Sequence, residues 1–293
     1  MFPLFGLLMV AFAVLGGFTM AGGRLHVLVQ PNELVLIGGA CLGTLVVSAV
    51  GNVRGQLVNT VWKAFGGSTP TREDYVDLLK LLYELFTFMR RNGAVALDEH
   101  VADVHKSSIF RKYPSFLANE RAADFLTDAL KQVVNGTASA DELEFMLETE
   151  LETNHEEHAI PIGLLKTAGD ALPGLGIVAA VLGIVTTMGR LDASPEEIGH
   201  NIAAALVGTF LGILLSYGLV QPLATNAELQ ELIGGRYLRC IKEGIVAALR
   251  GAAPVVAIEF ARKAIFAADR PSAEDTDRAC KQVKARPRPS LVS

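Results

Sequence analysis

The hydrophobic pattern of the chain is dominated by four long runs that contain no Asp, Glu, Lys or Arg. A membrane core of about 30 Å requires about 20 mostly apolar residues per helix, and each run has about that length. Arg24 follows the first run instead of preceding it, so we expect a retained helix and not a cleaved signal peptide. The four predicted membrane spans are Met1–Gly23, Leu34–Val53, Ala171–Gly189 and Ile202–Ala227.

The spans are predicted to form two hairpins with their large connection in the cytoplasm. The loops Arg24–Glu33 and Arg190–Asn201 are short, whereas the long segment Arg54–Asp170 separates the two pairs. An even number of spans places this segment and both termini on one side of the membrane. Lys and Arg near span ends are in excess on the cytoplasmic side. On the side of the long segment these are Arg54, Lys63, Arg72, Lys166, Arg236, Arg239 and Lys242, against Arg24 and Arg190 in the short loops.

The polar segments also have helical patterns. Thr69 is predicted to cap a helix that ends at Gly93, and further helices are predicted at Glu120–Val134 and Asp141–Glu157. The last of these is strongly acidic, and we interpret its acidic face as solvated in preference to a partner surface. The polar tail from Pro271 is predicted to be disordered. The fold class is therefore an all-α membrane protein with two transmembrane hairpins and a large helical cytoplasmic domain, divided at residues 1–53, 54–170, 171–227, 228–270 and 271–293.

Small and hydroxyl residues form stripes on the last two spans. Small residues allow helix backbones to approach closely in lipid, which is one interpretation of the stripes. The other is that the hydroxyl groups of Thr187, Thr209 and Ser216 line a polar path. Pro173 and Pro222, near the cytoplasmic ends of these spans, permit kinks. The stripes consist of Pro173, Gly176, Ala180, Gly183 and Thr187 on the third span and Ala205, Thr209, Gly212 and Ser216 on the fourth.

Composition removes several function classes. The chain is 51% hydrophobic and only 19% charged, and its net charge of −5 provides no basic field for nucleic acid. Its three cysteines lack the CxxC spacing of a zinc site, and the pair His155 and His158 lacks the HExxH pattern of a metalloenzyme. No cofactor, metal site or enzymatic activity is predicted. Because the four runs contain no carboxylate, a proton-coupled function would need a titratable group from a partner helix.

Several stretches of the chain resemble the MotA stator family. They are GGFTMAGG, QPNELVLIGGA, the segment Leu81–Asp98, DALPGLGIVAAVLGIV, ALVGTFLGILLSYGLVQPLA and APVVAIEFARKAIFAADRPS, in family order from Met1 to about Ser272. The resemblance implies a subunit of the bacterial flagellar motor in the cell inner membrane, which converts an ion-motive force into torque. It further implies a ring of five copies around a dimer of MotB, a single-span protein that supplies a titratable aspartate and is anchored to peptidoglycan.

The resemblance also implies roles for individual residues. Pro173 and Pro222 match two family prolines implicated in coupling ion flow to conformational change. Arg90 matches a cytoplasmic arginine that engages the rotor protein FliG, and Asp98 matches its acidic companion, which is commonly glutamate. From the residues alone, Arg90 could instead complement the helix dipole and Asp98 could cap a following helix.

The coupling ion is expected to be the proton, with sodium as the less favoured choice. Sodium-driven relatives carry threonine at the positions that match Ala180 and Thr209, and only Thr209 is a hydroxyl residue here. Sodium must regain several oxygen ligands, whereas a proton can pass along a hydrogen-bonded chain. The other interpretation of Ala180 is a simple packing residue. The predicted ion-path residues are Pro173, Ala180, Thr187, Thr209 and Pro222, on spans that we expect to face the partner helices through their small-residue stripes.

Three alternative functions remain open from the sequence. An ExbB/TolQ-type proton-channel energiser of outer-membrane processes shares the channel core, but such proteins typically have three spans. The additional hairpin Met1–Val53 therefore favours the stator. A membrane enzyme and a passive membrane scaffold are the other two classes, and a scaffold predicts no loss of ion flux when Pro173 is replaced.

Overall fold

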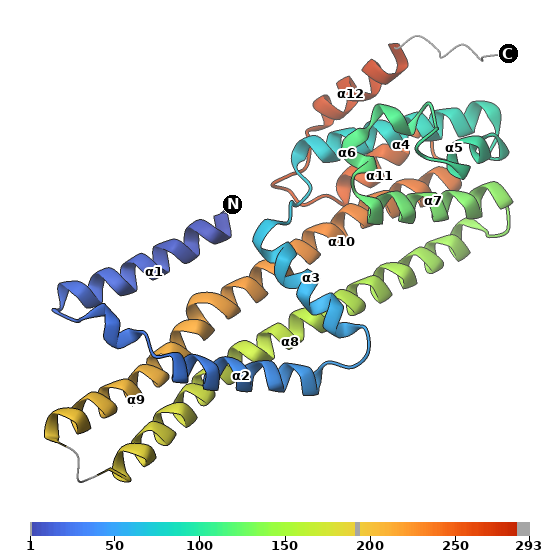
Figure 1. The fold of residues 1–293 in the computed structure, drawn as a ribbon. Coiled ribbons are helices and arrows are strands. Elements are labelled where there is room, and N and C mark those ends of the chain that lie inside the picture. Colours follow the sequence, from blue (N-terminus) through green and yellow to red (C-terminus); the bar gives the residue numbers. More distant parts are fainter. Residues whose placement is uncertain (1, 191–193, 286–293) are drawn as a thin grey trace. The chain divides into compact units, whose positions relative to one another are not determined.

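The computed structural model describes residues 2–190 and 194–285, which form helices and connecting turns and include no strand (Figure 1). These residues belong to two compact units, and α8 and α10 each contribute to both. The unit boundaries at 68/69, 156/157 and 230/231 differ from the predicted domain boundaries. The difference arises because α3 and the adjoining parts of α8 and α10 pack together as one cluster, which contains Ala64, Ile162, Leu165, Leu223, Ala224 and Ala227.

The first unit contains the apolar helices. It consists of α1 to α3, α8 from Glu157, α9, η4 and α10 up to Gln230. In the described residues, four helical stretches are long and apolar enough to cross a membrane, which confirms the predicted number of spans. The bounds are α1 Phe2–Met20, η1 Leu25–Leu28, α2 Pro31–Ser48, α3 Val53–Gly66, α8 Ala140–Met188, α9 Pro195–Leu215, the π-helical segment η4 Ser216–Val220 and α10 Gln221–Leu249.

Helix α8 is longer than the sequence pattern indicated. The predicted acidic helix Asp141–Glu157 and the predicted span Ala171–Gly189 belong to one helix of 49 residues, Ala140–Met188. Pro161 and Pro173 lie inside it without ending it. Helix α9 follows after Ser194, whose side chain caps the helix by accepting from the Glu197 amide. Residues 191–193 of the predicted loop lie outside the described residues.

The second unit contains α4 to α7, the first part of α8, the rest of α10, α11 and α12. Its core is formed by large apolar side chains, and Leu78, Leu82 and Phe86 of α4 are almost completely buried in it. The predicted helix Glu120–Val134 is confirmed as α7. The bounds are α4 Arg72–Asn92, η2 Val95–Leu97, α5 Asp98–Ala102, η3 Phe110–Lys112, α6 Pro114–Leu117, α7 Glu120–Asn135, α11 Pro254–Lys263 and α12 Ala273–Ala285.

Two local predictions are wrong in this unit. Helix α4 is capped by Thr71 and not by Thr69, because Thr71 and Asp74 form a reciprocal capping box. The tail predicted to be disordered from Pro271 contains α12, which packs against α4 and buries Cys280. The prediction failed because the few apolar residues of α12 that make this contact are outnumbered by polar ones. Residues 286–293 of the tail lie outside the described residues.

Candidate functional site

Helices α8 and α9 pack with their backbones in contact along the predicted small-residue stripes (Figure 1). A Cβ atom placed on Gly212 would lie 2.6 Å from the Leu172 carbonyl oxygen, and one on Gly176 would lie 2.8 Å from the Gly208 carbonyl oxygen. Only glycine fits at such a separation. Much of the two stripes is therefore used for packing within the chain, in agreement with the interpretation that small residues let the helix backbones approach closely.

Two of the predicted pore hydroxyl groups are bound to carbonyl groups of the chain. The Thr187 hydroxyl donates to the Gly183 carbonyl at 2.8 Å, and the Ser216 hydroxyl donates to the Gly169 carbonyl at 2.7 Å. Both side chains are almost completely buried. Thr209 is half-buried on the α9 side of the same contact, and Ala180 on α8 is buried. The structure thus places Ala180 and Thr187 on α8, Thr209 on α9 and Ser216 at the start of η4, with Thr187 bonded to its own helix.

The two predicted prolines lie beside different kinds of helix irregularity. Pro173 is half-buried inside α8, which continues past it. Pro222 is exposed and lies two residues after the π-helical segment Ser216–Val220, at whose end the Gln221 amide donates to the Ser216 carbonyl, five residues earlier. Single-turn π segments often occur at functional sites. Pro173 and Pro222 are therefore associated with local departures from regular α-helical hydrogen bonding.

Glu33 is also part of this helix assembly, although the sequence pattern placed it in a loop. Helix α2 begins at Pro31, so Glu33 lies in its first turn and not in the preceding loop. One carboxylate oxygen of Glu33 is buried against Gly208 of α9 and accepts no hydrogen bond from the described residues. The signal for this placement was Pro31 at the first position of a helix with an acidic residue in its first turn.

Arg90 and Asp98 are both exposed in the second unit. Arg90 lies in the last turn of α4, as predicted, and Asp98 is the first residue of α5. Neither makes an ion pair with a described residue. Asp98 also provides no side-chain cap, because the residue at the cap position is Leu97. The exposed Val95 lies between the two charged residues in sequence. We define these three exposed residues, Arg90, Val95 and Asp98, as one segment of the second unit.

Buried polar contacts hold the chain next to this segment. His100 is 6% exposed, and its Nδ1 atom lies 3.0 Å from the Ser107 hydroxyl oxygen. Phe88 of α4 contacts the imidazole edge-on, with ring centroids 4.8 Å apart. Burial lowers the pKa of His100, so the ring is neutral near pH 7. The α5 turn that carries Asp98 is consequently attached to α4 through His100.

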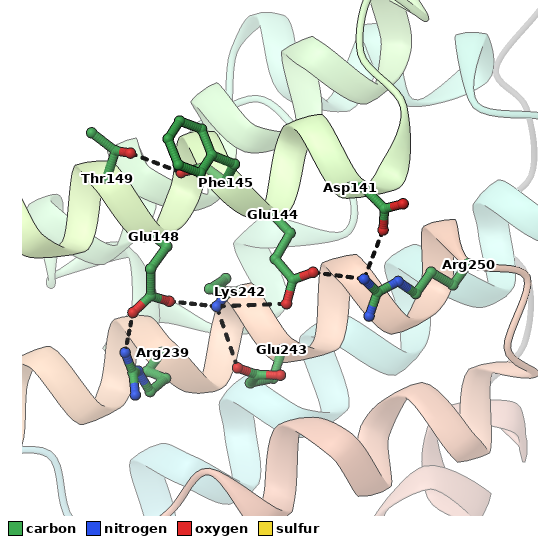
Figure 2. A network of polar contacts seen from close by, with 9 residues as sticks. All are labelled: Asp141, Glu144, Phe145, Glu148, Thr149, Arg239, Lys242, Glu243 and Arg250. Atoms are coloured by element: carbon green, nitrogen blue, oxygen red, sulfur yellow. Dashed lines mark hydrogen bonds and ion pairs between the residues drawn. The ribbon is translucent and has the colours of Figure 1, made fainter.

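An ion-pair ladder joins the acidic end of α8 to α10, as Figure 2 shows. Lys242 is 5% exposed, and its ammonium contacts the carboxylates of Glu148, Glu243 and Glu144. Lys242 and Arg239 lower the pKa of Glu148. At the far end, the guanidinium of Arg250 lies 2.8 Å from Asp141 and 2.6 Å from Glu144.

The ladder corrects the interpretation of the acidic face as only solvated. Asp141, Glu144 and Glu148 recur at helical spacing, and so do the basic residues of α10. This complementarity could have been found in the sequence if the two helices had been known to pack together. It explains why α8 remains helical through a strongly acidic stretch.

The comparisons with known proteins identify the family. Residues 4–93 match the family model described as Motility protein A N-terminal, and residues 117–228 match that of the MotA/TolQ/ExbB proton channel family. The chain is 39% identical to Motility protein A of Salmonella typhimurium (strain LT2) over 272 residues, which is 93% of this chain and 92% of that protein. The match to the N-terminal model covers the first hairpin and favours the stator over the ExbB/TolQ-type alternative.

Two solved structures share the fold. The structure of C. jejuni MotAB has a TM-score of 0.77 and 19% identity, and covers 92% of this chain and 98% of that chain. The flagellar MotAB stator complex from Bacillus subtilis has a TM-score of 0.72 and 24% identity, and covers 87% of this chain and 92% of that chain. Together with the sequence matches, these findings show that the chain belongs to the Motility protein A family, within the MotA/TolQ/ExbB proton channel family.

Proposed function

We propose that the chain is the stator subunit of a bacterial flagellar motor, working with a MotB-type partner to convert an ion-motive force into torque. The observation that carries the proposal is the α8–α9 pair, whose backbones pack closely at Gly176 and Gly212, with Pro173 inside α8 and the π segment at the end of α9. Such a pair can change its bend at defined points. The family match adds that relatives of this chain are motor and channel proteins, so we propose no enzymatic activity.

The proposed complex is a ring of five copies around two partner helices in the cell inner membrane. The central parts of the four apolar runs have no carboxylate, and the partner's membrane aspartate would supply the group that takes up and releases the ion. Both termini and the second unit would be cytoplasmic, as the distribution of basic residues indicates. Both similar structures are of MotAB, which supports a MotB-type partner.

The first experiment is complementation of cells that lack their own stator proteins. The chain should restore swimming only when it is expressed together with its MotB-type partner. A passive scaffold or an ExbB/TolQ-type energiser would not restore swimming in these cells. Restored outer-membrane uptake without motility would contradict the stator assignment and support the energiser.

We propose the proton as the coupling ion because Ala180, unlike Thr209, offers no hydroxyl on the proposed ion path. The test is the swimming speed of cells that have only this stator while external sodium is replaced by potassium at constant pH. A speed that follows the proton-motive force and ignores sodium is expected. A collapse of swimming in the absence of sodium would contradict the proton assignment.

The proposed rotor contact uses Arg90 and Asp98, with FliG as the partner. The Arg90→Glu variant should reduce torque while membrane assembly and ion conduction remain, because the side chain is exposed. Arg91→Glu is the matched control, since Arg91 lies in the same exposed last turn of α4 and senses the same helix dipole. Equal loss of torque in both variants would favour the dipole interpretation, and rescue by an opposite reversal on FliG would support the contact.

A further inference from the structure

Pro173 leaves one carbonyl group of α8 without its helical partner. In an α-helix each carbonyl accepts from the amide four residues later, and the residue four positions after Gly169 is Pro173. Proline has no backbone N–H. The Gly169 carbonyl must therefore find a donor elsewhere, because an unpaired backbone group in an apolar environment costs several kcal/mol.

The Ser216 hydroxyl supplies this donor from the neighbouring helix. Its Oγ atom lies 2.7 Å from the Gly169 carbonyl oxygen, and the Ser216 side chain is completely buried. The bond joins residues 47 positions apart in the chain. It differs from the Thr187 hydroxyl bond, whose acceptor lies four residues earlier in the same helix. The Ser216 bond thus compensates for the amide that Pro173 lacks.

The backbone around Gly169 is shaped to allow this contact. A Cβ atom on Gly169 would lie 2.9 Å from the side-chain nitrogen of Gln221, so the site accepts only glycine without a shift of that side chain. The same Gln221 nitrogen donates to the Asp170 carboxylate at 2.6 Å. Two neighbouring residues of α8 are therefore bound by the first residue of the π segment and by the residue that directly follows it.

The π segment Ser216–Val220 determines where these two donors lie. A π turn inserts one residue into an α-helical ladder and rotates the following residues relative to those before it. Ser216 begins the segment and Gln221 directly follows it, immediately before Pro222. The irregularity next to Pro222 and the carbonyl left by Pro173 are consequently connected through one buried hydrogen bond.

We propose that Ser216 is a positioning residue that couples the two proline sites, by donating to the Gly169 carbonyl that Pro173 leaves unpaired. This inference rests on the proposed function in that it assigns Ser216 to the moving part of the stator. A change of bend at Pro173 would move the Gly169 carbonyl and, through Ser216, the π segment. The coupling needs the hydroxyl and not only a small side chain.

The direct test is the carbonyl resonance of Gly169. Gly169–Asp170 is the only Gly–Asp pair in the sequence, so labelling glycine with carbonyl ¹³C and aspartate with ¹⁵N yields one backbone carbonyl–nitrogen correlation. The complex with its partner is measured in lipid bilayers by solid-state NMR. Ser216→Ala should shift the Gly169 carbonyl resonance upfield, because loss of a hydrogen bond shields the carbonyl carbon. Ser216→Thr retains the hydroxyl and should keep the original resonance.

A second substitution separates the proposed bond from general packing. Pro173→Ala restores an amide that can donate to the Gly169 carbonyl, so Ser216→Ala should have little further effect on the resonance in that background. Thr186→Val is the control, because it removes an exposed hydroxyl from α8 that donates to the Leu182 carbonyl. An unchanged resonance in Ser216→Ala, or equal shifts with and without Pro173, would overturn the proposal.

Motility measurements connect the bond to function. Ser216→Ala should reduce swimming speed at normal membrane assembly, Ser216→Thr should restore it, and Thr186→Val should leave it unchanged. If no variant supports motility but the resonance shifts as expected, the stator assignment fails while the hydrogen bond stands. If Ser216→Ala shifts the resonance and swims at the original speed, the coupling role is overturned.

Discussion

The α8–α9 contact and the core around α4 are stabilised by opposite kinds of residue. In the α8–α9 contact, Gly176 and Gly212 let the two helix backbones come together. In the α4 core, Leu82 and Phe86 fill the interior with large side chains. The two regions use different residues because a core in water and helices in lipid are stabilised by different interactions. Burial of apolar area stabilises a core in water by about 25 cal/mol per Å², but lipid is as apolar as leucine, so spans associate through close packing and hydrogen bonds.

The comparison also explains where each region tolerates irregular backbone. The π segment and Pro173 lie in the α8–α9 region, where Ser216 satisfies the freed carbonyl of Gly169. The α4 helix is regular and begins with a capping box at Thr71. A core of large interlocking side chains holds its helices in one arrangement. Helices that meet at glycines are held by a few hydrogen bonds and can move relative to each other more easily. We therefore expect the two regions to respond differently to substitution.

The largest effect is expected in the α4 core. Phe86→Ala removes a side chain that is 2% exposed and should destabilise the second unit by about 3–5 kcal/mol. Hydrogen exchange of the assembled complex should accelerate in α4 and change little in the α8 segment around Gly176. Phe145→Ala is the matched control, because Phe145 is 74% exposed. Faster exchange throughout both regions would show that they are not separate packing units.

A smaller effect is expected in the glycine contact. Gly212→Ala places a methyl group 2.6 Å from the Leu172 carbonyl oxygen and should cost about 1–3 kcal/mol through a forced shift of the helices. The measurement is the thermal unfolding midpoint of the complex in detergent, together with its assembly. Gly174→Ala is the control on α8, since no atom lies within 4 Å of its Cβ position. Alanine favours helix there, so Gly174→Ala should be neutral or stabilising; a midpoint lowered equally by both substitutions would contradict the close contact.

The sequence was sufficient for the features that depend on local composition. Charge-free length identified the four apolar helices, and the small-residue spacing identified a face that does pack closely at Gly176. Features that depend on which helices contact each other could not be derived from the sequence. Ser216 was recognised only as one hydroxyl of a stripe, because its bond to Gly169 joins two helices at a register set by the π segment. The helix α12 was missed because its few buried residues, such as Cys280, are outnumbered by charged ones.

The ion-pair ladder should respond to pH in a way that neither packed region does. The pKa of Glu148 is lowered in the folded protein, chiefly by the hydrogen bond from Lys242. The unfolded state therefore binds the proton more readily, so this stabilisation is complete above the ordinary glutamate pKa of about 4.3 and is lost as the pH falls. The Lys242→Met variant keeps the apolar stem of the side chain and removes its charge. It should lower the stability of the second unit by about 1–2 kcal/mol near pH 7, which lies between the contributions of exposed and of buried salt bridges.

The difference between Lys242→Met and the original protein should narrow as the pH is lowered, because protonation of Glu148 removes from the original protein the interaction that the variant already lacks. Unfolding midpoints measured from pH 7 down to about pH 2 test this expectation, because the loss occurs below the ordinary glutamate pKa. Arg250→Met is the control at the exposed end of the ladder, where Asp141 is 86% exposed and solvent screens the pair. Its effect should be the smallest of the series and should disappear at high salt. A Lys242→Met difference that stayed constant with pH would show that packing of the lysine stem, and not its charge, joins α10 to α8.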